Sequence, residues 1–480
     1  MSFLKRSNLS RPGTWWALSS TRARFTAAGA AVLVLGLVAT SVIVWNSPAN
    51  PVTQAAASVT RADIATAKIV AERNSLLSQV IALQKQLSGS KGNLSATKAQ
   101  LASIQQQLYS AQGALDAAAA AKTTMAARAK PITRKPSSTN AAGAVVTAPS
   151  KAEIINPTSR YFGMYTEQAP FNFASFDATA KKIGSQPNAV GYFGGWDQTF
   201  RADVVKASWK RNTLPILTWE SRPIGAANDA VEEPDYSLPK IIGDPATGVP
   251  GNFDAYLHQY AKDIVASGLP LGIRLDHEMN GVWYPWSEDD AKGTAINGNR
   301  PGDYVKMWQH VHDIFQEEGA NSLVAWIWAP NVINNLPATH KAPAYLDSLY
   351  PGSAYVDVVG LSGYLRPAYK PDNNFTFDYT FTPSLKELRR ITDKPILLAE
   401  IGASEVGGHK AAWISSLFQA LAKPENQDII GFSWFNLAVT SYTEGELATN
   451  DWRIDSRPDS LAAFTAGLAL PGGRFDLSPQ

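Results

Sequence analysis

The sequence predicts an α/β protein built on a (β/α)8 barrel, preceded by a transmembrane helix and a coiled-coil segment. Beyond about residue 160, eight short apolar runs alternate with helical segments, and two of these runs end in a glutamate. The first third of the chain contains a long uncharged apolar stretch followed by a heptad repeat. At 480 residues the chain is long enough for one large domain with appended segments.

Composition excludes some classes of function. The formal net charge is +2, from 43 basic and 41 acidic residues, which gives no field strong enough to recruit nucleic acid. The chain contains 14 Trp, 16 Tyr and 18 Phe, an enrichment that suits the binding of flat ligands as well as core packing. No cysteine is present, which excludes disulfides and thiolate metal sites and leaves the compartment open.

The apolar stretch from Phe25 to Trp45 contains no charge and is long enough to cross about 30 Å of hydrocarbon as a helix. Five basic residues precede it, and the next one is Arg61. The positive-inside rule therefore predicts a cytoplasmic basic tail over residues 1–24, a signal anchor over 25–45 and export of the rest from a single-pass cell-membrane protein. A cleaved signal peptide, with a small-residue site at 55–57, is the alternative interpretation.

Residues 58–121 are rich in Ala and Gln and carry an apolar residue at every seventh position. This seam consists of Val80, Leu87, Leu94, Leu101, Leu108 and Leu115. It predicts a coiled-coil stalk capable of self-association, although Gly89 and Gly92 interrupt it and leave a helical hairpin or a solitary helix open. Residues 122–157 lack apolar periodicity and are predicted to form a flexible linker before a catalytic domain over 158–470.

The eight apolar runs predict eight strands. They are residues 161–166, 189–196, 214–221, 271–278, 323–329, 356–364, 396–401 and 429–435. Helical spacing recurs between them, over residues 198–211, 254–267, 302–318, 383–391 and 409–421. Such alternation predicts a parallel barrel of the TIM type, in which catalytic groups gather at the carboxyl ends of the strands.

Two predicted strand ends carry carboxylates. The fourth strand ends at Glu278, with Arg274 and Asp276 expected on the same side of the strand, and the seventh ends at Glu400 after a continuous apolar run. Either glutamate alone could be a salt-bridged structural residue. Together they would face each other across the barrel mouth, as a pair of carboxylates does in retaining glycoside hydrolysis at about 5 to 5.5 Å.

Other chemistries fit less well. His277 and Glu278 begin like a zinc-protease motif, but its second histidine would fall at Gly281, and no serine occupies a nucleophile elbow. His310 and His312 lie within a predicted helix and are expected to be structural or exposed. We therefore expect neither a metal nor an organic cofactor.

The string HEMNGVWYPW over residues 277–286 closely resembles the acid/base motif of glycoside hydrolase family 26, within the large clan of (β/α)8 hydrolases. Further segments occur in the order found in that family, and the resemblance covers about residues 160–470 and excludes the anchor and stalk. These segments are residues 304–315, 326–331, 350–364, 394–405 and 431–436.

This resemblance implies a retaining endo-acting hydrolase, a mannan endo-1,4-β-mannosidase or a β-glucanase, that cleaves β-mannan or mixed-linkage β-glucan. It implies that Glu278 is the acid/base and Glu400 the nucleophile. Three aromatic or imidazole groups would contact the sugar: His277 and Tyr364 at the cleavage point, and Trp434 as its stacking platform. Trp283 would shape the neighbouring site. A noncatalytic, membrane-tethered carbohydrate-binding barrel is the alternative from another class.

Overall fold

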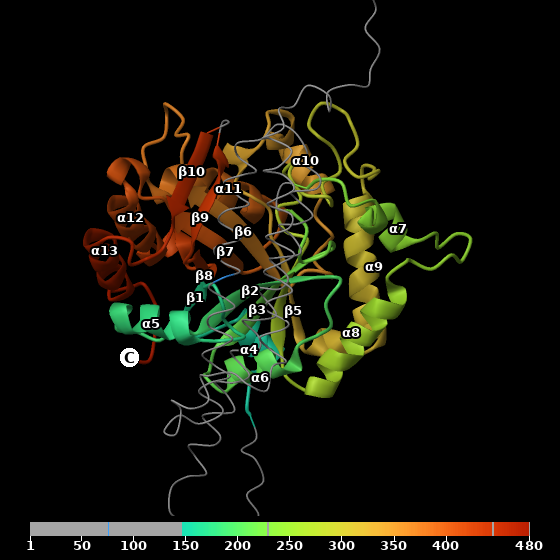
Figure 1. Cartoon of the computed structure of the whole chain (residues 1–480), viewed down its shortest axis with the longest axis horizontal. Coiled ribbons are helices and arrows are strands. Elements are labelled where there is room, and N and C mark those ends of the chain that lie inside the picture. The colour runs from blue at the N-terminus through green and yellow to red at the C-terminus, as the bar shows by residue number, and fades with distance from the viewer. Residues whose placement is uncertain (1–74, 76–145, 228–229, 444–445, 480) are drawn as a thin grey trace, which may run out of the picture. The chain divides into compact units, whose positions relative to one another are not determined.

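The computed structural model describes residue 75 and residues 146–227, 230–443 and 446–479 (Figure 1). The predicted basic tail and transmembrane helix lie outside the described residues, as do the stalk, except Ser75, and most of the linker. Within the part of the chain that is described, no helix is long and apolar enough to cross a bilayer.

Eight parallel strands close into a barrel in which each strand pairs with the next and β8 pairs with β1 (Figure 1). The strands are β1 (Tyr161–Tyr165), β2 (Ala189–Gly195), β3 (Leu214–Glu220), β4 (Leu271–Leu275), β5 (Val324–Trp328), β6 (Val358–Leu365), β7 (Ile396–Ala403) and β8 (Ile429–Phe435). The predicted barrel and all eight predicted strands are confirmed, because apolar runs buried on both faces are what a closed parallel sheet requires.

Helices surround the strands on the outside (Figure 1). They are α4 (Lys151–Ile155), α5 (Ala174–Ile183), α6 (Ala202–Trp209), α7 (Leu238–Ile242), α8 (Asp254–Ser267), α9 (Asp303–Glu317), α10 (Pro343–Ser348), α11 (Phe377–Ile391), α12 (Lys410–Ala422) and α13 (Pro458–Leu468). The helix predicted over residues 254–267 matches α8 in both bounds. The helix predicted to start at Pro383 starts earlier, because the Thr376 hydroxyl accepts from Tyr379 N and caps it there, so that Pro383 lies inside α11.

The fourth strand is shorter than predicted, and this changes how its end is built. β4 ends at Leu275, and both Asp276 and Glu278 have left-handed backbones, with φ of 39° and 57°. Alternation along a strand therefore does not set the direction of these two side chains. A turn after the strand positions them instead.

The barrel domain begins before the predicted bound of 158 and ends after the predicted bound of 470. Ser150 and Glu153 form a capping box at the start of α4, and Ile154 is buried, so the predicted linker ends before α4. At the other end Phe475 packs on Phe418 and Phe432, which extends the domain beyond residue 470.

Arg160 joins these two ends of the domain. Its guanidinium is fully buried and donates to three backbone carbonyls, those of Ile429 at 2.7 Å, Gly473 at 2.9 Å and Asn426 at 2.8 Å. The first strand is thereby fastened to the last strand and to the carboxyl-terminal tail.

A two-stranded antiparallel sheet, β9 (Ala438–Thr443) and β10 (Glu446–Asp451), follows β8. Its base is held by Lys410, which is fully buried at the start of α12 and donates to the carbonyls of Asp451 at 3.2 Å and Arg453 at 2.6 Å. Glu405 balances the charge of Lys410 at 3.3 Å. The segment that follows the last barrel strand is thus fixed to the end of β7.

Candidate active site

Glu400 lies in β7 and is held from two sides. One carboxylate oxygen, Oε2, accepts from Arg274 of β4 at 2.5 Å, and the other, Oε1, accepts from the hydroxyl of Tyr364 of β6 at 2.5 Å. Arg274 is fully buried and donates also to Thr218 at 3.2 Å and to Ser362. Both oxygens of Glu400 therefore accept hydrogen bonds, one of them from a cationic donor.

Tyr364 remains a donor at neutral pH. Burial, and then the charge of Glu400, raise the pKa of Tyr364 well above its usual value. Its phenol therefore stays protonated and continues to donate to Glu400.

Glu278 is placed by the turn that follows β4. Its backbone N donates to the carbonyl of Ala329 at the end of β5, at 2.7 Å, which fixes the turn against the neighbouring strand. The indole of Trp283 donates to its Oε2 at 2.9 Å. Both Glu278 and Glu400 are 7% exposed, so each is recessed but reachable from solvent.

The two carboxylates differ electrostatically. Burial, and then the negative charge of Glu400, raise the pKa of Glu278. Arg274 and hydrogen bonds from Trp283 and Asn331 oppose this shift without cancelling it. Glu278 is therefore the member of the pair that more readily holds a proton, whereas Glu400 has a direct cationic partner.

His277 lies beside this pair in an aromatic setting. Its ring is 1% exposed and lies 4.8 Å from the ring of Tyr284 and 5.9 Å from that of Trp286. Burial, and then the charges of Arg274 and Arg222, lower the pKa of His277 well below its usual range. The ring is thus neutral, and its Nδ1 is buried without a hydrogen-bond partner among the described residues.

Asp276 supports the neighbouring strand. Its two carboxylate oxygens accept from the backbone N and the hydroxyl of Ser221, each at 2.7 Å. Burial raises the pKa of Asp276 to about 7, although the two bonds from Ser221 oppose the shift. Asp276 therefore ties the end of β3 to the turn that carries Glu278, and its side chain bonds to Ser221 rather than to Glu278 or Glu400.

A chain of hydrogen bonds leads from Glu278 toward the outside. Asn331 interacts with Glu278, and it also exchanges two bonds with Asn280, at 2.8 and 2.9 Å. The Nδ1 of His340 lies 3.0 Å from the carbonyl oxygen of Asn280, and the Nε2 of the same ring lies 3.0 Å from a carboxylate oxygen of Asp289. Each ring nitrogen of His340 thus faces an oxygen acceptor, which fixes the orientation of the ring.

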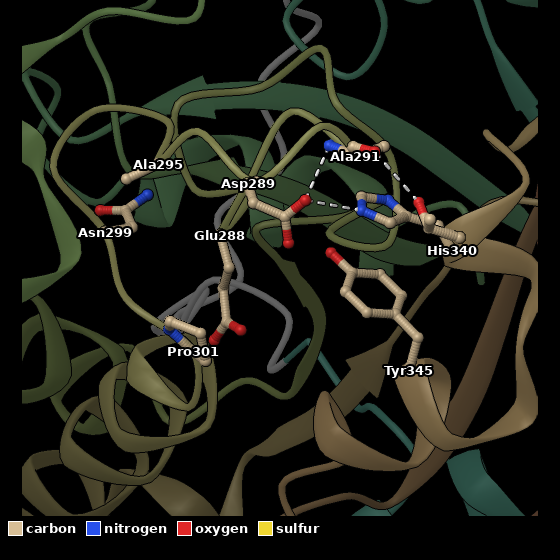
Figure 2. Close-up of a pocket in the computed structure, with 10 residues that line it drawn as sticks. Glu288, Asp289, Ala291, Ala295, Asn299, Pro301, His340 and Tyr345 are labelled. Atoms are coloured by element: carbon tan, nitrogen blue, oxygen red, sulfur yellow. Dashed lines mark hydrogen bonds and ion pairs between the residues drawn. The ribbon is translucent and has the colours of Figure 1, made fainter.

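A cavity of about 320 Å³ lies at the outer end of this chain (Figure 2). Figure 2 shows the His340 ring between Asp289 and Tyr345, and the rings of His340 and Tyr345 stack at 3.9 Å. Glu288 also lines the cavity, and its Oε1 accepts from the backbone N of Gly302 and of Tyr304 at the start of α9. Carboxylates thus dominate the charge of this cavity.

Trp434 does not lie where the resemblance implies. Its ring is fully buried, packs against Trp413 and Phe464 of the outer helices, and donates to the carbonyl of Trp452 at 2.6 Å. Successive residues of a strand point to opposite sides, so Trp434 faces the helices and its neighbour Phe435 faces the barrel interior. A sugar cannot stack on Trp434 in this structure, and the expectation of a stacking platform at that residue was wrong.

The structure places two other aromatic rings near Tyr364. The ring of Trp452 lies 5.1 Å from that of Tyr364, and the ring of Phe435 lies 6.0 Å from it. Trp452 directly follows β10 and is 7% exposed. It was not singled out from the sequence because it lies beyond the last predicted strand.

Most of the other tryptophans near strand ends are core residues, as the fully buried Trp219, Trp286, Trp326 and Trp328 illustrate. Arg274 had a signal that could have identified it as part of the site, because an unneutralised cation inside a buried parallel strand is costly. Asn280 and Asn331 carried no such signal in the sequence, since their roles depend on loop conformation.

Within the described residues, no group of three or more His, Asp or Glu side chains could hold a metal ion.

The chain is similar in sequence to several known proteins. Residues 225–415 match the family model described as glycosyl hydrolase family 26, and they include Glu278 and Glu400. Endoglucanase H of Acetivibrio thermocellus is 33% identical over 289 residues, which are 59% of this chain and 28% of that protein. A mannan endo-1,4-beta-mannosidase of Bacillus subtilis strain 168 is 24% identical over 269 residues, which are 52% of this chain and 66% of that protein.

The matches thus span less than two thirds of the length of each of these two relatives. Among solved structures, the catalytic domain of an endo-beta-1,4-mannanase from Bacillus sp. JAMB-750 is 17% identical. The match covers 67% of this chain and 88% of the mannanase chain, with a TM-score of 0.48.

Proposed function

Because the barrel of this chain belongs to glycosyl hydrolase family 26, we propose that it is a retaining, endo-acting hydrolase of β-1,4-linked polysaccharide. The observation that carries the proposal is the unequal environment of its two carboxylates. Glu400 is bonded to Arg274 and Tyr364, whereas burial and the charge of Glu400 favour a proton on Glu278. A nucleophile must be ionised and an acid must be protonated, so the two environments suit the two roles.

The proposed reaction has two displacements. In the first, a carboxylate oxygen of Glu400 attacks the anomeric carbon, the bond from that carbon to the glycosidic oxygen breaks, and Glu278 gives its proton to the departing oxygen. In the second, the ionised Glu278 takes a proton from water, the water oxygen attacks the anomeric carbon, and Glu400 leaves. The anomeric configuration is inverted twice and so retained.

We assign contacts with the sugar at the cleavage point to His277 and Tyr364, and a neighbouring contact to Trp283. Tyr364 and Trp283 are supported by their hydrogen bonds to Glu400 and Glu278. His277 is supported by its position next to Glu278 in the sequence and by its neutral ring beside Tyr284.

The substrate that we propose is β-mannan or mixed-linkage β-glucan. The relatives carry the names mannan endo-1,4-beta-mannosidase and endoglucanase, which support these two classes. Release of reducing ends from mannan, glucomannan, mixed-linkage glucan and xylan by the full-length protein separates them. A protein that only binds would retard migration in an affinity gel containing the polymer and release no reducing ends.

The roles of the two glutamates can be separated with an aryl glycoside whose leaving group departs without a proton. Glu278→Ala should form the glycosyl-enzyme normally and hydrolyse it slowly, giving a burst followed by slow turnover. Added azide needs no base, so it should restore turnover of this variant and yield a β-configured glycosyl azide. Glu400→Ala should be impaired on every substrate.

The opposite pattern would reverse the two roles. It consists of azide rescue of Glu400→Ala to an α-configured azide, with no rescue of Glu278→Ala. Full activity of both single variants on the polymer would overturn the hydrolase assignment.

We further propose that residues 25–45 anchor the protein in the cell membrane with the barrel outside. The support is the charge asymmetry around an uncharged apolar stretch. The protein should fractionate with membranes, and external protease should release an active fragment beginning within residues 123–150. A mature protein that is entirely soluble and starts near Ser58 would indicate signal-peptide cleavage instead.

A further inference from the structure

A small cavity opens beside the candidate active site at the end of β6. Its volume is about 50 Å³, room for a few water molecules or for one small anionic group, and too little for a sugar ring. The polar side chains that line it include Asn334, Asn335, Tyr364, Arg366, Lys370 and Tyr379. They come from the end of β6, from the segments that follow β5 and β6, and from the first turn of α11 (Figure 1).

The cavity is connected to both catalytic carboxylates. Tyr364, on one side of it, donates to Glu400 at 2.5 Å. Asn335, which also lines it, donates to Asn331 at 3.2 Å, and Asn331 in turn interacts with Glu278. A group that occupies the cavity therefore lies one side chain away from Glu400 and two side chains away from Glu278.

Positive charge gathers around this cavity. Arg366 lies two residues after Tyr364 and lines the same cavity, and Lys370 lies across it with its ammonium on the carbonyl of Asn334. Burial, and then the nearby charge of Lys341, lower the pKa of Lys370, which shows that the two ammonium groups are close.

The carboxylate of Asp372 offsets this charge only in part. It acts on Lys370 more weakly than Lys341 does, and one of its oxygens accepts from the hydroxyl of Tyr379 at 3.0 Å. Among the residues that the structure describes, neither Arg366 nor Lys370 has an ion-pair partner. Arg366, Lys370 and Lys341 are exposed, so water screens the repulsion between them, and a bound anion would gain the modest attraction of partly solvated ion pairs.

The larger cavity of Figure 2 has the opposite character, because Glu288 and Asp289 line it. An anion would be repelled there. Of these two cavities, the one beside Tyr364 is the one lined by cationic side chains.

We infer that the cavity between Arg366 and Lys370 is a subsite for an anionic substituent of the polysaccharide, either the carboxylate of a uronic acid or an ester of sulfate or phosphate. The guanidinium of Arg366 offers a planar pair of donors for the two oxygens of such a group, and Lys370 supplies a second charge. This inference rests on the proposed hydrolase function and names the class of polymer that the site prefers.

The test compares one neutral polymer with its charged derivatives. The full-length protein is assayed on the mannan or glucan that it hydrolyses fastest, on the same polymer partly oxidised at C6 to uronate, and on a partly sulfated sample. At low salt, kcat/KM should be about two- to fivefold higher for at least one charged polymer, the effect of one or two partly exposed ion pairs. The preference should fall toward one in about 0.5 M salt, because the charges are screened.

Two double variants identify where the preference arises. Arg366→Gln with Lys370→Gln should lower the ratio of charged to neutral kcat/KM to one or below. Lys181→Gln with Lys206→Gln removes the same net charge from exposed positions on α5 and α6 and should keep the ratio. The polymer whose ratio responds identifies carboxylate or sulfate ester as the preferred substituent.

Failure of the subsite and failure of the hydrolase proposal are distinguishable. If the neutral polymer is hydrolysed but no charged polymer is preferred, or the Arg366 and Lys370 double variant keeps the preference, the subsite is overturned while the hydrolase stands. If no polymer is hydrolysed, calorimetric titration with oxidised manno-oligosaccharides tests the subsite independently of hydrolysis. Tighter binding to the wild type than to that double variant supports the subsite, and equal or absent binding overturns it.

Discussion

Arg274 of β4 and Glu400 of β7 come from strands that are not neighbours in the barrel, and they meet in its interior in an ion pair of 2.5 Å. The pair spans the positions of β5 and β6. The cationic partner of Glu400 is therefore brought to it by closure of the barrel.

Replacing Arg274 by Met should lower kcat by about 100-fold or more, because Glu400 loses a positioned charged donor. Stability should fall by about 3 to 5 kcal/mol, the cost of leaving a buried carboxylate unpaired. Arg274→Lys keeps the charge but loses the planar set of guanidinium donors. Its kcat and its stability should therefore lie between those of the wild type and of Arg274→Met. Kinetics below the melting temperature of each variant separate the effects, and wild-type kcat in Arg274→Met would contradict the assignment.

Trp283→Phe should move the basic limb of the pH profile of kcat/KM to higher pH. The indole N–H of Trp283 bonds to Glu278 and favours its charged form, so its removal raises the pKa of Glu278 further. An acid with a higher pKa keeps its proton to higher pH. Asn331→Ala should act in the same direction, and a shift of the basic limb to lower pH in both variants would argue against Glu278 as the acid.

Asp276 should make the protein less stable as the pH rises. Its pKa in the folded state is about 7, above the value of about 3.9 for an unfolded chain, so its favourable contribution is complete below pH 4 and is lost as the pH rises through 7. Asp276→Asn does not titrate. As the pH rises from 4 to 7, the melting temperature of Asp276→Asn should therefore increase relative to that of the wild type. The corresponding change in the free energy of unfolding is about a few kcal/mol at most.

The same variant also loses one hydrogen bond to Ser221, but that loss is independent of pH. Glu317→Gln, an exposed change at the end of α9, serves as the control and should follow the wild-type curve. Parallel melting curves for wild type and Asp276→Asn across this range would show that Asp276 does not titrate as described.

Trp434 and Trp452 should behave differently on substitution. Trp434→Phe should lower the melting temperature, because the ring is packed in the core, and leave KM unchanged. Trp452→Ala should lower kcat/KM for the polymer, because its ring lies beside Tyr364 at 5.1 Å. A rise in KM confined to Trp434→Phe would restore that residue as a substrate contact.

The barrel could be predicted from the sequence because its strands are buried on both faces and so appear as continuous apolar runs. Glu278 and Glu400 could be predicted because carboxylates at the ends of such runs are costly without a function. The side on which Trp434 lies could not be inferred from its family motif alone, since a shift of one residue reverses the face. The bonds of Asn280 and His340 could not be predicted either, because they depend on irregular loops that approach each other only in the fold.

The hydrogen bond from Arg160 to the carboxyl-terminal segment bears on how the protein can be immobilised. Both ends of the barrel domain lie at the starts of the strands: α4 precedes β1, and Gln186, just before β2, bonds to the carbonyl of Ser478 at 2.8 Å. Glu278 and Glu400 lie toward the opposite rim, where β4 and β7 end. A protein immobilised through its carboxyl terminus should therefore present the rim that carries the two carboxylates to the solution, so that even a polymer too large to diffuse around the support can reach them.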